Sequence, residues 1–95
     1  MFLRTNRLDE SIKTLSRVIS YDPNNADALA NLGASYGNKG MFNESAQFYQ
    51  RSLKARPVQP PNVFMSMSNV YRFLGDSANA QKYRQLMFQA QANGT

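Results

Sequence analysis

The chain has 95 residues, 42% of them hydrophobic, contains neither cysteine nor histidine, and carries a formal net charge of +5. The missing cysteines exclude disulfides and thiolate chemistry, and the missing histidines remove the commonest metal ligand and catalytic base. No apolar run is long enough to span a bilayer, and the opening residues 1–8 are too short and too polar for a secretory signal. We therefore expect a small soluble domain with no metal and no cofactor, and we favour a cytoplasmic location.

The basic charge invites a nucleic-acid interpretation, but its placement argues against one. Basic residues fall on the outward faces of three predicted helices, among Gln and Ser, and no aromatic residues are interleaved with them to stack on bases. These residues are Lys13, Arg17, Arg51, Lys54 and Lys82. We expect a solvated outer face, and nucleic acid stays the weakest alternative, because such a binder must lose affinity steeply with salt.

Residues 1–23 repeat the second half of the unit that follows them. Asn6 stands 34 residues before Gly40, and Asn and Gly are the residues that most readily take the left-handed conformation closing a helix. This spacing predicts that residues 1–5 are the last turn of a helix fragment. A full helix is then predicted over residues 8–21.

Residues 24–57 predict two amphipathic helices folded back on each other. Asn24 or Asn25 is suited to cap the first helix, which ends near Asn38, and the second helix covers residues 42–55. Gly33 lies inside the first helix, where Gly costs about 1 kcal/mol relative to Ala. We therefore expect Gly33 to permit a close approach of the paired helix.

Residues 58–95 form a third, less regular unit after a Pro-rich joint. Helices are predicted over residues 62–74 and from the Gly75-Asp76-Ser77 connection to about Ala92. Arg84 falls where a large apolar residue is expected. Tyr83 and Met87 are therefore predicted to supply the packing of the last helix.

The central unit contains Leu29-x-x-Leu32-Gly33-x-x-Tyr36, then Ser45-x-x-x-Tyr49 and a closing Pro57. This pattern resembles the tetratricopeptide repeat, although Leu29 stands where the family most often has Trp and Ser45 where it prefers Ala. The resemblance implies an all-α fold of antiparallel helix pairs stacked as a short right-handed superhelix. One domain, residues 1–95, would hold about two and a half repeats and five helices plus a fragment of a sixth. The repeats are predicted as 1–23 (partial), 24–57 (full) and 58–95 (full, irregular).

In this family the first helix of each pair lines the concave wall, which identifies a candidate peptide-binding groove. Its residues would be Asp27, Asn31, Asn38, Asn62, Met65, Asn69, Arg72 and Phe73. The amides would hydrogen-bond the backbone of an extended peptide, and Arg72 or Arg4 would meet a carboxylate. Met65 and Phe73 favour this interpretation, because a solvated helix face gains nothing from large apolar side chains. The alternative is that these polar residues simply face solvent.

The function that these patterns favour is a non-catalytic protein–protein interaction module and scaffold, with another protein or peptide as its partner. The serines have no histidine and no suitably spaced lysine to activate them, so we do not expect an enzyme. The alternative function is self-assembly. Leu8, Leu15 and Val18 of the predicted helix 8–21 would face a helix of which only residues 1–5 remain, and a homodimer would cover them.

Overall fold

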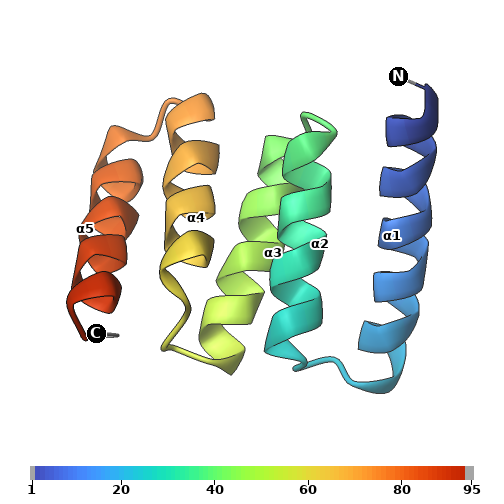
Figure 1. Cartoon of the computed structure of the whole chain (residues 1–95), viewed down its shortest axis with the longest axis horizontal. Helices are drawn as coiled ribbons and strands as arrows, with labels where there is room; N and C mark the ends of the chain where they lie inside the picture. Colours follow the sequence, from blue (N-terminus) through green and yellow to red (C-terminus); the bar gives the residue numbers. More distant parts are fainter. Residues whose placement is uncertain (1, 94–95) are drawn as a thin grey trace. The chain divides into compact units, whose positions relative to one another are not determined.

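The computed structural model describes the backbone of residues 2–93 and the side chains of residues 7–92. Within this part every regular element is helical, which confirms the prediction of an all-α helical repeat (Figure 1). The helices are α1 (Phe2–Tyr21), α2 (Ala26–Asn38), α3 (Phe42–Ala55), α4 (Pro61–Phe73) and α5 (Ser77–Asn93).

The chain divides into two compact units, Met1–Pro57 and Val58–Thr95. The first unit holds α1 and an antiparallel pair, α2 and α3, which we call the first hairpin; the second unit is the antiparallel pair of α4 and α5, the second hairpin (Figure 1). The division falls in the Pro-rich joint. The assignment of residues 1–95 to a single domain, and the repeat boundaries within it, stay predictions.

Helix α1 runs without a break through Asn6, so the predicted turn at this residue, with its separate helix fragment, is wrong. In the described part only Gly40 (φ 83°) and Gly75 (φ 79°) have positive φ, and each follows the first helix of a hairpin. The left-handed conformation costs a residue with a Cβ about 1–2 kcal/mol. Asn6 instead continues the helix, which keeps its backbone hydrogen-bonded within α1.

Short polar residues and a proline stand at the beginnings of α2, α4 and α5. The Asn25 side chain accepts a hydrogen bond from the Ala28 N–H at 3.0 Å and so caps α2. Pro61 is the first residue of α4, where its missing N–H and fixed φ are tolerated. Asp76 Oδ1 accepts from the Asn79 N–H at 3.2 Å at the start of α5.

The core of the first unit lies on α2, which packs against α1 on one side and α3 on the other. Leu29 and Leu32 are 1% and 0% exposed. A Cβ at Gly33 would lie 2.8 Å from the ring of Tyr49 in α3, closer than such atoms approach. The predicted close approach at Gly33 is thus confirmed, and the group that makes it is an aromatic side chain.

Buried or partly buried serine hydroxyls join the two helices of each hairpin. Ser45 and Ser52 of α3 donate to the carbonyl oxygens of Gly33 and Ala26 in α2, at 2.6 and 2.8 Å. In the second hairpin Ser68 of α4 donates to a carbonyl of α5, that of Ala80, also at 2.8 Å. These hydroxyls are held by main-chain acceptors and have a structural role.

The core of the second unit is aromatic. Tyr83 of α5 is 2% exposed, and its ring stacks on Tyr71 and Phe64 of α4 at centroid distances of 5.5 and 6.4 Å. The prediction that Tyr83 supplies packing for the last helix is confirmed. Met87 is half-buried.

Candidate functional site

The outward face of α2 carries three of the predicted groove residues. Asp27, Asn31 and Asn38 are all exposed. The Asp27 carboxylate accepts a hydrogen bond from the Arg56 guanidinium at 2.7 Å, so it already has a cationic partner. Within residues 7–92 neither amide side chain makes a hydrogen bond, and both are therefore available to a ligand.

The corresponding face of α4 combines polar and apolar side chains. Asn62, Met65, Asn69 and Arg72 follow helical spacing and form one stripe, with Phe73 beside it. Met65 is 53% exposed and Phe73 is 64% exposed. The Arg72 guanidinium lies 6.0 Å from the centre of the Phe73 ring. Large apolar side chains in water beside a cation are unusual on a helix that only faces solvent.

A cleft of about 480 Å³ lies within the second hairpin, between α4 and α5. Its α4 wall includes three predicted residues, Met65, Asn69 and Arg72. Its α5 wall includes Arg84 and Met87, which the sequence analysis did not assign to a site. The sequence signal for them was present, since Arg84 occupies a position where the repeat pattern expects a large apolar residue.

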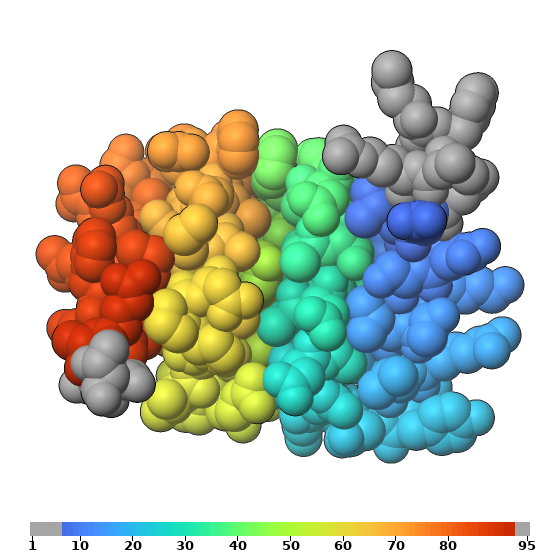
Figure 2. Space-filling view, in the orientation of Figure 1, coloured from blue at the N-terminus to red at the C-terminus, as the bar shows by residue number. Residues whose placement is uncertain are grey.

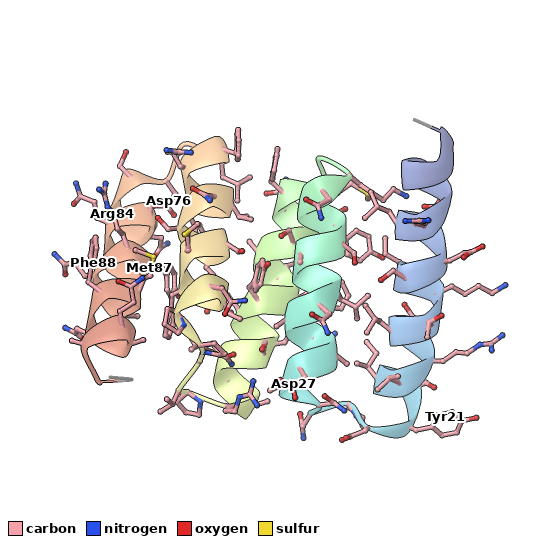
Figure 3. The ribbon with its side chains drawn as sticks, viewed as in Figure 1. Tyr21, Asp27, Asp76, Arg84, Met87 and Phe88 are labelled. Carbon is pink, nitrogen blue, oxygen red and sulfur yellow. The ribbon has the colours of Figure 1, made fainter. Side chains whose placement is uncertain are left out.

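Figure 3 shows where the labelled residues of α5 lie. Met87 is on the side of α5 that faces α4, whereas Phe88 is on the far side. The Arg84 guanidinium lies 6.0 Å from the centre of the Phe88 ring. Asp76 is the one acidic residue of residues 58–95. Its carboxylate lies at the start of α5, where it also accepts a hydrogen bond from the Asn79 side chain at 2.7 Å. The cleft therefore carries positive charge with no carboxylate in its walls.

The residues predicted for self-association lie on α1. Leu8, Leu15 and Val18 are half-buried, and α1 packs against α2. In the space-filling view the long side chains of α1 project away from α2 (Figure 2). Among residues 7–21 of this helix the exposed ones are polar or charged, apart from Tyr21 at its end, which is 89% exposed. Self-association through α1 stays a prediction.

The basic residues of α3 also border a cleft. Arg51 and Lys54 line a depression of about 490 Å³ beside Asn24, Leu29 and Ala55. The Arg51 guanidinium lies 5.4 Å from the centre of the Phe48 ring, and that ring stacks on Tyr36 at 5.3 Å. The Phe48 ring is therefore engaged within the hairpin, and it is not free to stack on a base.

No group of three or more Asp, Glu, His or Cys side chains is arranged to hold a metal ion in the described part of the chain. None of the helices there has both the length and the apolar character that crossing a membrane requires.

Family models match two overlapping parts of the sequence. The model described as "TPR repeat" matches residues 1–40, and the model described as "Tetratricopeptide repeat" matches residues 26–59. Together they account for the first unit.

Two curated proteins are similar to part of the chain. One, from Solanum lycopersicum, is named "Probable UDP-N-acetylglucosamine--peptide N-acetylglucosaminyltransferase SPINDLY" and is 39% identical over 57 residues, or 60% of this chain. The protein of the same name from Petunia hybrida is 37% identical over 51 residues, or 54% of this chain. The chain spans 6% of the length of either relative.

A solved structure has a similar fold. The chain named "MamA MSR-1 C2" matches 94% of this chain with a TM-score of 0.81, and the match covers 51% of that chain. At 20% identity this likeness concerns the fold alone.

Proposed function

This chain belongs to the tetratricopeptide repeat family, whose members bind other proteins, and on this premise we propose that it holds a peptide or helix against its first helices, α2 and α4. In the superhelix that the family implies, first helices line the concave wall. The module is non-catalytic in this proposal. The transferase activity in the names of the relatives belongs to proteins of which this chain spans only 6%.

The observation that carries the proposal is the composition of the exposed face of α4. Met65 and Phe73 are more than half exposed, beside the amide of Asn69 and the guanidinium of Arg72. Apolar anchors with polar neighbours are what a protein-binding surface needs, because the apolar groups supply burial and the polar groups fix orientation. Asn31 and Asn38 on α2 add donors and acceptors for a peptide backbone.

The test begins with a selection of binders from a random peptide library on the immobilised chain. A selected peptide is then titrated by calorimetry into the parent chain and into Asn69→Ala and Asn31→Ala. We expect each variant to lose about 0.5–1.5 kcal/mol of binding free energy, the usual net contribution of a hydrogen bond. Thermal melting provides the control for the fold. Unchanged affinity in both variants would remove these amides from the binding surface.

Self-assembly through α1 remains the second candidate. It is supported by the half-burial of Leu8, Leu15 and Val18 on a helix that packs against α2. A second copy of the chain would complete the burial of these side chains, each worth up to about 1.5–3 kcal/mol when fully buried. Sedimentation over a wide concentration range, with Leu15→Glu as the comparison, tests it. A parent chain that stays monomeric throughout rejects this candidate.

A further inference from the structure

We infer that the cleft between α4 and α5 is an anchoring subsite for a peptide segment in which Asp or Glu adjoins a large apolar side chain. This inference rests on the proposed function, that the chain binds peptides. The subsite adds Arg84 and Met87 of α5 to the proposed binding surface. Its occupant is defined by an acidic side chain next to a large apolar one.

The cleft exists because two residues of the second hairpin differ from their counterparts in the first. Positions in the two hairpins correspond at a spacing of 35 residues, so Ser68 matches Gly33 and Arg84 matches Tyr49. In the first hairpin the Tyr49 ring, 2% exposed, lies so close to Gly33 that a Cβ there would be only 2.8 Å away. Ser68 has that Cβ. An aromatic ring placed as in the first hairpin would not fit beside it, and the exposed Arg84 leaves the space open.

The charge of the cleft selects an anionic partner. Arg72 and Arg84 both line it, and neither forms an ion pair with any residue in the described part of the chain. The Arg72 guanidinium lies over the Phe73 ring, and the Arg84 guanidinium lies over Phe88 on the side of α5 away from α4, so neither charge is neutralised. The Arg84 side chain lines the cleft and must turn from Phe88 to place its guanidinium on a ligand there. A guanidinium matches a carboxylate through two parallel hydrogen bonds, so an acidic side chain is the ligand group that fits.

The methionines add an apolar requirement. Met65 and Met87 line the cleft from α4 and α5, and Met65 is 53% exposed. Their flexible thioether side chains adapt to apolar groups of different shape. A segment with a carboxylate and a neighbouring Leu, Met or Phe would use both features. A nucleic acid would meet the arginines through its phosphates but would offer no aliphatic side chain to the methionines, so we favour the peptide.

The experiment uses methyl-labelled methionine, because the chain carries its own reporters. Met65 and Met87 line the cleft, whereas Met41 lies in the first unit and Met67 is fully buried. The probes are three pools of short peptides built from Leu, Met and Gly, with Asp and Glu in the first, Asn and Gln in the second, and Lys in the third. An oligouridylate is the fourth probe. We expect only the acidic pool to shift the Met65 and Met87 methyl resonances strongly, with Met41 unmoved.

Matched variants distinguish the effect of the two cleft arginines on binding from the effect of the overall positive charge. Arg72→Gln and Arg84→Gln should each weaken binding of the acidic pool by about fivefold, as for loss of a partly exposed charge-assisted contact. Lys82→Gln is the control, since it removes the same charge from the same helix but does not line the cleft. Thermal melting of each variant shows that the fold is retained, and Lys82→Gln should bind like the parent.

The possible results distinguish failure of the acidic subsite between α4 and α5 from failure of peptide binding as a whole. If the neutral or basic pool binds as well as the acidic one, or if binding shifts amides of α2 but not Met65 and Met87, the inference is wrong and peptide binding stands. If Met65 and Met87 shift with protein concentration alone, a second copy of the chain occupies the cleft and the inference is wrong. Equal binding of the oligouridylate also overturns it. If no probe and no library peptide binds at any residue, the proposed function fails as well.

Discussion

The two hairpins of this chain have the same plan but different contacts where their helices meet. In each hairpin a glycine of positive φ, Gly40 or Gly75, lies in the turn between the two helices. In each hairpin a serine hydroxyl of one helix also donates a hydrogen bond to a main-chain carbonyl of the other helix. The direction of this serine–carbonyl hydrogen bond differs between the two hairpins. Ser45 on the second helix donates to Gly33 on the first, whereas Ser68 on the first helix donates to Ala80 on the second. Ser68 matches Gly33 and Ala80 matches Ser45, so the hydroxyl has exchanged helices.

The exchange has a consequence for the surface. With glycine on the first helix, an aromatic ring at position 49 covers the contact and is buried. With serine there, no aromatic ring stands at the matching position, which is the exposed Arg84. The other aromatic contact is kept, because Tyr83 matches Phe48 and stacks on Tyr71 as Phe48 stacks on Tyr36. The first hairpin thus closes its contact with a ring, and the second leaves a charged cleft.

The largest expected effect tests the different placement of two neighbouring residues of α5, the buried Tyr83 and the exposed Arg84. Tyr83→Ala should lower the free energy of unfolding by about 3–5 kcal/mol, because it removes a large, almost fully buried ring. Arg84→Ala, one residue further on, should change it by less than about 0.5 kcal/mol, since the side chain is exposed. Chemical denaturation of the two variants measures both. Similar losses for the two would mean that the ring and the arginine are placed wrongly on α5.

The second prediction concerns the closed contact of the first hairpin. Gly33→Leu should destabilise the chain by about 1–3 kcal/mol through overpacking, despite the better helix propensity of Leu. Gly33→Ala should also destabilise, and the penalty should vanish when Tyr49 is replaced by Ala as well. A double-mutant cycle measures this coupling. A higher melting temperature for Gly33→Leu would contradict the placement of this helix face.

The third prediction concerns the exchanged hydroxyl. Ser45→Ala and Ser68→Ala should each lower the free energy of unfolding by about 0.5–1.5 kcal/mol, because each removes one buried or partly buried hydrogen bond. In the second hairpin, Ser68→Gly combined with Ala80→Ser should restore the bond in the direction of the first hairpin. The double variant should therefore recover part of the loss seen for Ser68→Ala. Denaturation curves of Ser45→Ala, Ser68→Ala and the double variant measure these changes. If the double variant recovers none of the loss, Ala80 is not equivalent to Ser45.

The smallest expected effect is electrostatic. Asp27 and Arg56 form an ion pair in the first hairpin, and the matching positions of the second hairpin are the neutral Asn62 and Gln91. Asp27→Asn should cost about 0.2–1 kcal/mol at low salt, since both side chains are substantially exposed. High salt should abolish the difference, because exposed charges are screened. Thermal melting in low and high salt checks this; a loss that persists in high salt would point to another role for Asp27.

The boundaries of the helices followed from the sequence because they depend on a few residues with strong local preferences. Asn25, Gly40, Pro61 and Gly75 each act within one turn of the chain, and their effects can be read without the rest of the molecule. Asn6 is the exception. Asn only permits the left-handed conformation, and the backbone of α1 stays helical there.

The candidate site was less accessible to prediction. The spacing of α4 indicated Met65, Asn69 and Arg72, because one helix face can be read from a periodic sequence. Arg84 and Met87 come from the facing helix, and their part in the cleft depends on how two helices pack. The traces of the cleft in the sequence are Arg84, which does not fit the repeat pattern, and Ser68, which stands where the first hairpin has Gly33. They could be interpreted once the contact between Gly33 and Tyr49 was known.

The central claim is that the second hairpin binds a peptide because its helix contact is left open. The most direct test transfers the closed contact of the first hairpin into the second, as Ser68→Gly with Arg84→Tyr. A library-selected peptide is then titrated into this variant and into the parent. The account predicts a folded variant whose affinity is lower by about tenfold or more, equivalent to about 1.4 kcal/mol of binding free energy. A folded variant that binds the peptide as tightly as the parent would contradict it.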